Sequence, residues 1–386
     1  MTGAAGRGAE RSAIVVGGGL SGLATAIALH GRGWRVRVLE RAPRLAEAGA
    51  GISLWPNALR ALDAIGVGER VRAMGGPELH GGIRRRDGRF LARTDAAEIA
   101  RRYGSVVILH RADLLQALVE AVPAGSVDTG HAVDNVDNLD NVDGATATVD
   151  GEPADLVVGA DGIRSAVRRS VWPQAAGPRY VGYTAWRWVT RPLAEPLHDA
   201  GETWGAGTRF GYAGLPDGRV YCYATANVPA GEKDEDGYGH LKAMFGDWHD
   251  PIPALVAAAD KGEVLRHDME ELPDLPSYVH GRVALVGDAA HAMTPNLGQG
   301  ACQAFEDVAT LAAVLDEERD VATALSRYDR LRRRHTQSVV RQSRRVGQIG
   351  QWSSPIAVGL RDRLLALVPA SATTRSLTQL LEWSPR

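Results

Sequence analysis

The sequence predicts an α/β protein in which an antiparallel sheet is inserted into a domain built on a parallel sheet, with a helical region at the C-terminal end. Three observations predict this arrangement. Short, mainly apolar runs at Ala13–Val16, Ala154–Gly159 and Arg282–Val286 each lead into a glycine-containing turn, as buried parallel strands do. Aromatic segments of alternating polarity lie within residues 178–228, which is typical of antiparallel strands: Tyr180–Thr190, Thr203–Tyr212 and Arg219–Ala226. From Gly300 onward the pattern is helical, with breaks near Gly347 and Pro355, and the 386 residues suit two domains.

Composition excludes several classes of protein. With 45% hydrophobic and 23% charged residues, the chain has enough apolar side chains for a sizeable core. The formal net charge of −2 gives no field that favours nucleic acid or an acidic membrane. Cys222 and Cys302 are too few for a disulfide scaffold or a closed zinc site, so we expect no metal and a reducing, cytoplasmic location. No run approaches the roughly 20 apolar residues that span a bilayer, so we expect no membrane partner.

The first motif lies in a βαβ unit at the N-terminal end. Gly17, Gly19, Leu20, Ser21 and Gly22 belong to a G-x-G-x-x-G turn that follows the strand Ala13–Val16 and opens the helix Leu23–His30. The glycines permit a tight turn, close approach of a pyrophosphate, and close packing of helix on strand. The strand Arg35–Leu39 then delivers Glu40, whose carboxylate is placed for ribose hydroxyls. An acid here favours FAD or NAD over NADP.

Two further strands end in an aspartate. Asp161 follows Ala154–Gly159, and Asp288 follows Arg282–Val286. Ligands of open α/β sheets bind at such carboxyl ends, although Asp161 is also read as a local helix cap. The loop with Pro295, Gly298, Gln299 and Gly300 then opens a long Ala-rich helix, whose N-terminus can stabilise negative charge on a bound ring system.

These three motifs, in this order, resemble those of the single-component, class A flavin monooxygenases typified by para-hydroxybenzoate hydroxylase. The resemblance spans roughly residues 13–345. It implies a Rossmann-like FAD-binding domain (1–75, 105–176 and 277–345), a substrate-binding domain (76–104 and 177–276) and C-terminal helices (346–386). It implies that Glu40 and Arg41 hold the adenosine ribose and that Arg111 and Asp288 lie along the FAD chain. Asp161 is linked to both FAD and NAD(P)H, and the Pro295–Gly300 loop lies against the isoalloxazine.

The resemblance also implies the reaction. NADH or NADPH reduces the flavin, O2 forms a C4a-hydroperoxide, and one oxygen hydroxylates or epoxidises a small, electron-rich, aromatic or heteroaromatic substrate. The flavin carries this chemistry and the protein orients and desolvates it. Alternatives left open are a related flavoprotein reductase or halogenase, and a protein that binds flavin and sequesters a ligand. The Trp-x-Trp-x-Ile-Pro segment usual in halogenases is absent, since Val189-Thr190 follows Trp188. Either a monomer or a homodimer is compatible with the sequence.

Candidate active-site residues come chiefly from the inserted sheet. In Trp186-Arg187-Trp188 the period of two places Arg187 on the face opposite both tryptophans. We expect Arg187, Arg209 and Pro295 to be catalytic. Further substrate contacts are expected from a set of four side chains: Trp186, Tyr212, Tyr223 and Asn57.

Two other patterns receive plainer interpretations. The arginines of the 330–334 run, with Arg341, Arg344 and Arg345, have helical spacing, and we interpret them as a solvated face or a self-association surface. His291 follows the Gly287-Asp288 pair, where packing at the start of a helix explains its presence as well as catalysis does. An Asp- and Asn-rich repeat at 131–143 lacks the ligand spacing of known calcium loops, so it is interpreted as a surface connection.

Overall fold

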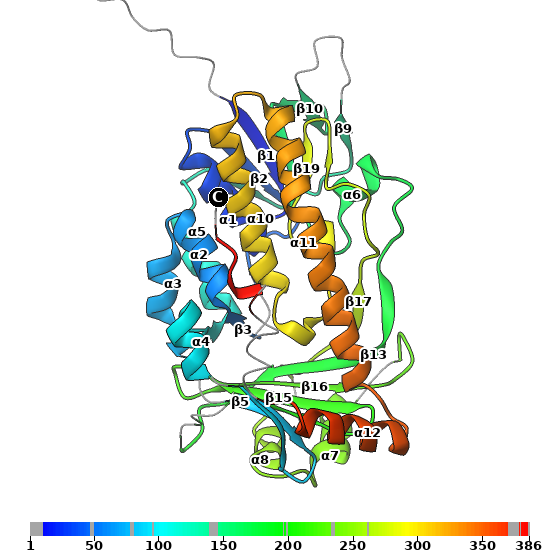
Figure 1. Cartoon of the computed structure of the whole chain (residues 1–386). Helices are drawn as coiled ribbons and strands as arrows, with labels where there is room; N and C mark the ends of the chain where they lie inside the picture. Colours follow the sequence, from blue (N-terminus) through cyan, green and yellow to red (C-terminus); the bar gives the residue numbers. More distant parts are fainter. Residues whose placement is uncertain are drawn as a thin grey trace, which may run out of the picture.

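Two layers of structure, stacked end to end, form the molecule (Figure 1). The computed structural model describes residues 11–46, 50–77, 81–94, 96–138, 146–195, 197, 200–232, 236–260, 262–369, 378 and 380–384. A parallel sheet with its helices occupies one end, and a broad, mostly antiparallel sheet closes the other. This arrangement confirms the predicted fold class, while the domain boundaries remain predictions. The second half of the Asp- and Asn-rich repeat lies outside the described residues.

The strands are β1 (Ser12–Val16), β2 (Arg35–Glu40), β3 (Gly51–Leu54), β4 (Gly76–Pro77), β5 (Gly81–Arg85), β6 (Phe90–Thr94), β7 (Val107–His110), β8 (Val127–Thr129), β9 (Val136–Asn138), β10 (Ala147–Val149), β11 (Glu152–Ala154), β12 (Leu156–Gly159), β13 (Arg179–Val189), β14 (Ala200–Trp204), β15 (Thr208–Gly214), β16 (Val220–Ala226), β17 (Leu265–Glu271), β18 (Val279–His280) and β19 (Val283–Leu285). The helices are α1 (Leu20–His30), α2 (Pro56–Ala64), α3 (Gly68–Met74), α4 (Ala96–Tyr103), α5 (Arg111–Ala121), α6 (Ala166–Val171), α7 (Gly237–Phe245), α8 (Ile252–Ala257), α9 (Asp288–His291), α10 (Gly300–Glu317), α11 (Val321–Gly350) and α12 (Pro355–Ala366), with a 3-10 turn at Pro295–Leu297.

The first sheet has the order β18-β19-β12-β1-β2-β8 and is parallel apart from β18. β1 lies in its middle, so both faces of that strand are covered, which explains why its sequence is apolar without alternation. The carboxyl ends of β1, β12 and β19 lie side by side at one edge. The glycine-rich turn and the two aspartate turns, far apart in the sequence, therefore meet there.

The second sheet has the order β17-β13-β16-β15-β14-β5-β6. Its outer face packs on α7 and α8 through an apolar cluster that includes Trp188, Phe210 and Phe245. Its inner face looks toward the parallel-sheet domain, since Tyr221 of β16 packs on Gly51 of β3. The alternating segment predicted across Thr203–Tyr212 is in fact two strands, β14 and β15, which are joined by a turn that contains Gly205 and Gly207.

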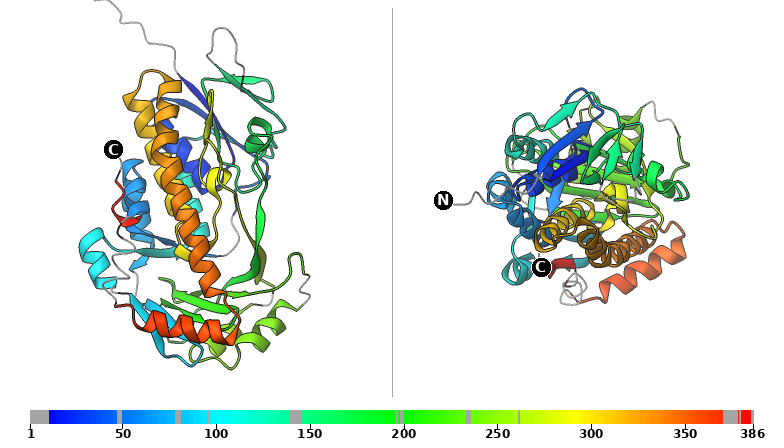
Figure 2. Two further views of the ribbon diagram at one scale, coloured as in Figure 1. Left: turned by 45° about the vertical axis from the view of Figure 1, so that its right-hand side comes forward. Right: turned by 90° about the horizontal axis from the view of Figure 1, so that it is seen from above.

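The helical C-terminal region differs from the prediction at one point. The expected break near Gly347 is absent, because α11 continues unbroken to Gly350. Gly347 instead permits close packing: a Cβ there would lie 2.4 Å from the Asn296 Nδ2. The break at Pro355 is confirmed, and Pro355 opens α12, which lies across the far end of the molecule (Figure 2). Among the described residues, the helices are too short or too polar to cross a membrane.

Candidate active site

The glycine-rich turn is shaped by its neighbours and leaves room for a ligand. Gly17 has φ +105°, and a Cβ there would lie 2.5 Å from the Ala160 carbonyl oxygen. A Cβ at Gly22 would lie 1.8 Å from the Gly17 carbonyl oxygen. At Gly19, by contrast, a Cβ would meet nothing within 4 Å. The first and third glycines are thus required by packing, while the second borders open space at the N-terminus of α1, where a pyrophosphate would bind.

Glu40 lies beside this turn, as predicted. Its Oε2 accepts a hydrogen bond from the Gly18 amide at 2.6 Å, and its Oε1 accepts one from the Ala42 amide at 2.8 Å. A carboxylate oxygen can accept more than one hydrogen bond, so both oxygens retain capacity for ribose hydroxyls. Arg41 is exposed next to it.

The two predicted aspartates reach the same edge of the sheet. Asp161 does cap α6, because its Oδ2 accepts from the Ala166 amide at 2.6 Å and from the Val167 amide at 3.2 Å. Its Oδ1 is buried and lacks a hydrogen-bond partner among the described residues, which is what a ligand-facing oxygen would show. Asp288 is exposed at the start of α9, although the neighbouring Gly287 and Ala289 are buried.

The loop before α10 presents its residues unevenly. Pro295 and Gly298 are exposed, whereas the side chain of Gln299 is buried. The Gly300 position borders open space at the helix N-terminus, and the buried Trp55 Nε1 has no described partner where it faces Gly298. An unpaired buried N–H and an open helix N-terminus both suit the polar edge of a flavin ring.

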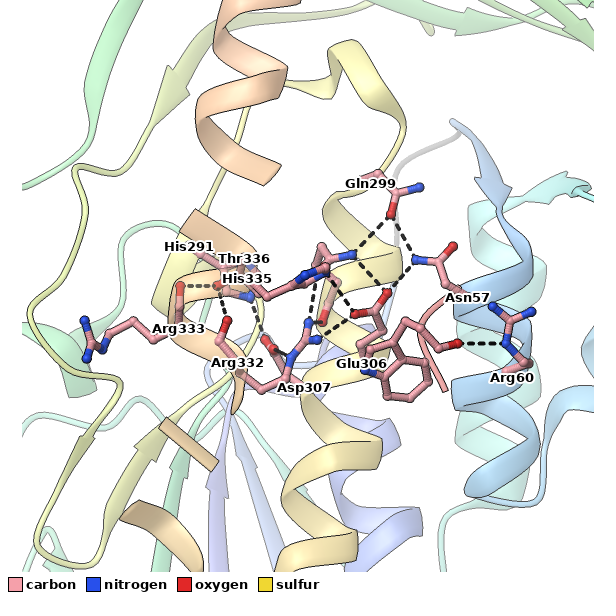
Figure 3. Close-up of polar contacts among 12 residues, drawn as sticks. Asn57, Arg60, His291, Gln299, Glu306, Asp307, Arg332, Arg333, His335 and Thr336 are labelled. Atoms are coloured by element: carbon pink, nitrogen blue, oxygen red, sulfur yellow. Dashed lines mark hydrogen bonds and ion pairs between the residues drawn. The ribbon is translucent and has the colours of Figure 1, made fainter. Parts of the chain in front are cut away.

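A buried polar network holds this loop in place (Figure 3). Arg332 of α11 donates to Glu306 at 2.6 Å and to Asp307 at 2.7 Å, both on α10. Glu306 also accepts from Asn57 at 2.6 Å, and Asn57 donates to the Gln299 oxygen at 3.0 Å. The network therefore connects three helices to the loop that is predicted to face the flavin.

The same network reaches the second aspartate turn. The Asp307 Oδ2 accepts from the Gly287 amide at 3.0 Å and pairs with the His291 Nε2 at 2.5 Å. Burial opposes ionisation of Asp307, yet the charges of His291 and Arg332 hold the pKa of this carboxyl below its usual value. His291 is therefore a buried packing residue that pairs with Asp307, as the packing interpretation of the sequence suggested.

Two predictions change here. Asn57 is fully buried and its amide is shared by Gln299 and Glu306, so it supports the loop and is not available to a substrate. Arg332 was included in a solvated arginine face, but it is 1% exposed and is the cation of the network. The sequence does not show this, because helical spacing alone does not tell which arginine faces inward.

The inner face of the second sheet carries Arg187, as the alternation of β13 predicts. Arg187 pairs with Tyr223 of β16 across the ladder, and Tyr221 lies two residues further on the same face. The guanidinium contacts the Met269 sulfur at 3.8 Å and has no carboxylate within ion-pair distance among the described residues. Burial raises the pKa of both Tyr221 and Tyr223, so both phenols stay protonated. The Tyr223 hydroxyl is already hydrogen-bonded to Glu202, which leaves the hydroxyl of Tyr221 to donate to a ligand.

Tyr221 also marks where the two domains meet. Its hydroxyl is close enough to Arg187 and Arg111 for both charges to lower its pKa against the larger effect of burial. Arg111 begins α5 in the parallel-sheet domain, so the predicted cofactor arginine and the predicted active-site arginine approach the same phenol. Tyr221 was not among the substrate contacts predicted from the sequence. It lies on the same side of the strand as Tyr223, and the sequence contains no feature that singles it out.

Arg209 lies deeper than predicted. It is 2% exposed, and it donates to Asn296 at 2.7 Å, to Gln351 at 3.1 Å and to Glu202 at 3.2 Å. Tyr183 donates to the same Asn296 oxygen at 3.2 Å. Arg209 thus connects the sheet to the residue that follows Pro295 and to the end of α11. This geometry suits a positioning residue better than one that touches a substrate.

Trp186 and Tyr212 lie on the wrong side of the sheet for the predicted role. Both belong to the apolar cluster on the outer face and are 3% and 4% exposed. The period of two places them opposite Arg187, Tyr221 and Tyr223, so we do not retain them as substrate contacts. The exposed His267, across the ladder from Ala185, lies on the inner face instead, and burial followed by the charge of Arg187 lowers its pKa.

Comparisons with known proteins agree with this geometry. A family model described as FAD binding domain matches residues 10–203 and 274–343. Aurachin C monooxygenase/isomerase from Stigmatella aurantiaca is 36% identical over 377 residues, covering 96% of this chain and 98% of that protein. 2-Heptyl-3-hydroxy-4(1H)-quinolone synthase from Pseudomonas aeruginosa is 38% identical, covering 95% of this chain and 97% of that protein.

Solved structures give the same answer. HpxO of Klebsiella pneumoniae, complexed with FAD and uric acid, superimposes with a TM-score of 0.89 at 29% identity, covering 96% of this chain and 97% of that one. The match covers nearly the whole of both chains, and the names of the two curated relatives specify a monooxygenase and a synthase of a hydroxylated product. The chain therefore belongs to the FAD-dependent monooxygenases whose shared feature is this FAD-binding domain.

Proposed function

We propose that the enzyme uses NADH or NADPH and O2 to hydroxylate or epoxidise a heteroaromatic ring that carries an acidic or carbonyl oxygen, such as a 4-quinolone. One observation carries this proposal. The inner face of the second sheet combines Arg187, a cation without a described carboxylate partner, with the protonated phenol of Tyr221. A cation beside a neutral donor suits an oxygen that bears partial or full negative charge.

The residues at the edge of the parallel sheet fit FAD. In this proposal the open space at Gly19 receives the pyrophosphate, Glu40 and Arg41 hold the adenosine ribose, and Asp288 and Arg111 lie along the connecting chain. The unpartnered Asp161 Oδ1 supports a ligand at that turn. Bound FAD would supply the electron transfer and oxygen activation that amino acid side chains cannot perform.

The protein's own part is to bind and polarise the substrate ring. Arg187 would hold the oxygen attached to the ring as an anion or enolate, and the Tyr221 phenol would donate to the same oxygen. Negative charge on that oxygen increases electron density at the neighbouring ring carbons, which makes them better nucleophiles toward an electrophilic oxygen donor. Pro295 would border the ring from the flavin side, and its exposure is consistent with that position.

Two relatives support this substrate class. The name of the Pseudomonas aeruginosa relative specifies a 3-hydroxylated 4-quinolone with a heptyl chain. HpxO was solved with uric acid, another nitrogen heterocycle, whose rings carry carbonyl oxygens. Both are flat rings with acidic positions, in keeping with an aromatic-lined site closed by a cation. The nitrogen heterocycle with a ring carbonyl is what the two have in common, so we assign that class to this chain.

A turnover assay with labelled oxygen tests the proposal. The FAD-loaded enzyme is given NADH or NADPH with 2-alkyl-4-quinolones, urate or a simple phenol, and products are analysed by mass spectrometry under 18O2. We expect substrate-stimulated reductant oxidation and one 18O atom in the product of at least one nitrogen heterocycle. Tight binding without oxygen incorporation across the panel would contradict the proposal.

The role of Arg187 is tested by a matched pair of variants. Arg187→Leu should lower kcat/KM about 10–100-fold, since a charge-assisted hydrogen bond contributes roughly 1.5–3 kcal/mol. Arg191→Leu is the control, because Arg191 lies just beyond β13 with its side chain 82% exposed and a 3.5 Å ion pair to Asp260. Equal activity of the two variants would exclude Arg187 from substrate binding.

A further inference from the structure

The large exposed hydrophobic side chains of the molecule gather in one short segment. Among the residues that the structure describes, the exposed ones all fall between positions 349 and 368: Ile349, Trp352, Ile356, Leu360, Leu364, Leu367 and Val368. Three of them, Ile356, Leu360 and Leu364, recur at every fourth position within α12 and so form a stripe along this helix. Ile356 is 86% exposed and Leu367 is 79% exposed, so this stripe points directly into solvent.

The helix is held with its charged side inward. Arg361 is 1% exposed and donates to the carbonyls of Gly350 at 3.2 Å and Gly205 at 3.1 Å. Its guanidinium also lies 5.4 Å from the ring centre of Trp204 and pairs with Asp362 at 2.9 Å. A surface helix normally buries its apolar face. Here the contacts of Arg361 hold the helix with its apolar stripe facing outward.

The exposed charges next to these hydrophobic side chains in the sequence have one sign. Arg363 and Arg345 are both exposed. Between positions 349 and 369 the acid in the sequence is Asp362, which is paired inward with Arg361. Figure 1 and Figure 2 show α12 on the outside of the second sheet, at the far end from the parallel sheet. The segment is therefore a projecting apolar ridge flanked by cations.

We propose that this ridge, defined as α12 with Ile349 and Trp352, docks on an anionic lipid surface. Helices that lie in a membrane interface bury leucines and tryptophan among the acyl chains and keep arginines at the headgroups. A second copy of the chain fits less well, because a twofold contact between two ridges would bring Arg363 and Arg345 toward their own copies. The prediction of no membrane partner concerned spanning helices and net charge, and this ridge is a local feature of another kind.

The position of the ridge connects it to the active site. Trp352 also lines a cavity of about 620 Å³ whose wall includes Tyr183 and Asn296, the residue after Pro295. This part of the inference rests on the proposed function: a heteroaromatic substrate with an alkyl chain partitions into lipid, and docking at the ridge would place the enzyme where such a substrate is concentrated. Because the lipid contact itself needs no substrate, the two proposals can fail separately.

Vesicle binding of the full FAD-loaded protein tests the inference. Flotation with phosphatidylglycerol–phosphatidylcholine vesicles, with phosphatidylcholine vesicles and without lipid is measured in the absence of substrate. We expect binding to the anionic vesicles, at least a tenfold loss of affinity in the Leu360→Gln/Leu364→Gln double variant, and weaker binding in Arg363→Gln but not in Arg334→Gln. Arg334 is exposed on α11 away from the ridge and serves as the matched control.

Other outcomes overturn the inference. Wild-type protein that ignores anionic vesicles, or a double variant that binds as well as wild type, excludes lipid docking. Light scattering that shows a dimer in wild type and a monomer in the double variant assigns the ridge to a second copy. Turnover of a dissolved substrate, measured without vesicles in the same variants, should stay within twofold of wild type. If the wild-type protein itself does not turn over the dissolved substrate, that result counts against the proposed function and not against lipid docking.

Discussion

Replacement of Arg332 by methionine should destabilise the protein severely. Methionine retains an unbranched stem of similar length but removes the cation. Glu306 and Asp307 are both fully buried and lose their ion pairs at 2.6 and 2.7 Å. Burial already raises the pKa of Glu306, against the opposing charge of Arg332, so this carboxyl is sensitive to the loss of that cation.

The magnitude follows from what remains after the substitution. Removing one partner of a buried ion pair costs about 3–5 kcal/mol, because the other partner is left as an uncompensated buried charge. Natural domains have a total stability of about 5–15 kcal/mol, so this loss is a large fraction of it. With an unfolding entropy of about 2.1 cal/mol/K per residue over 386 residues, 1 kcal/mol corresponds to about 1.2 °C, so we expect the Tm to fall by about 4–6 °C.

Urea and thermal unfolding of three proteins measure this effect. Arg333→Met is the control, because Arg333 pairs with Asp329 at i,i+4 with side chains that are 28% and 14% exposed, and it should lose only about 1 kcal/mol or less. The triple variant Arg332→Met/Glu306→Gln/Asp307→Asn removes the uncompensated charges and should recover at least half of the lost stability. A loss below about 1 kcal/mol in Arg332→Met, or no recovery in the triple variant, would refute the reasoning.

Further predictions concern the cofactor turn, the active site and pH. Gly19→Ala should weaken FAD binding without changing the stability of the apoprotein. Gly17→Ala should lower the stability of the apoprotein by roughly 1–3 kcal/mol or more, because Gly17 has a φ of +105° and lies against Ala160. FAD titration and urea unfolding of both variants distinguish these two effects. Tyr221→Phe should reduce kcat/KM about tenfold while FAD affinity stays unchanged, and a normal kcat/KM would remove this phenol from the site. Burial, with the charge of Arg332, lowers the pKa of His335 from 6.5 to about 4. The stability gained by keeping His335 neutral is complete above pH 6.5 and is lost as the pH falls from 6.5 toward 4. This contribution to stability is at most roughly 3 kcal/mol, and solvent screening reduces it because the side chain is 31% exposed. His335→Gln should flatten the stability–pH curve in that range, and an unchanged curve would show that His335 is not responsible.

The cofactor half of the site was the more predictable half. A glycine turn, or an aspartate after a buried strand, depends on a few adjacent residues and on the rule that strand carboxyl ends meet at one edge. Glu40, Asp161 and Asp288 therefore reach that edge as the sequence indicates. The alternation of β13 likewise sufficed to separate Arg187 from Trp186.

The supporting interactions were not predictable in the same way. Asn57, Glu306 and Arg332 come from three helices, and their contacts depend on how those helices pack, not on local pattern. Tyr212 illustrates a related limit: alternation assigns residues to two faces but does not say which face of β15 looks inward. Only the position of α7 and α8 on the outer face decides that question.

The length of α11 has a consequence for how the enzyme admits its ligands. Its 30 residues form one continuous rod of about 45 Å. Arg332 fastens the rod to α10, and Gln351, just past its end, accepts from Arg209 of the second sheet. The two parts of the molecule are therefore bridged along this side, so a wider gap between them would open at the opposite edge.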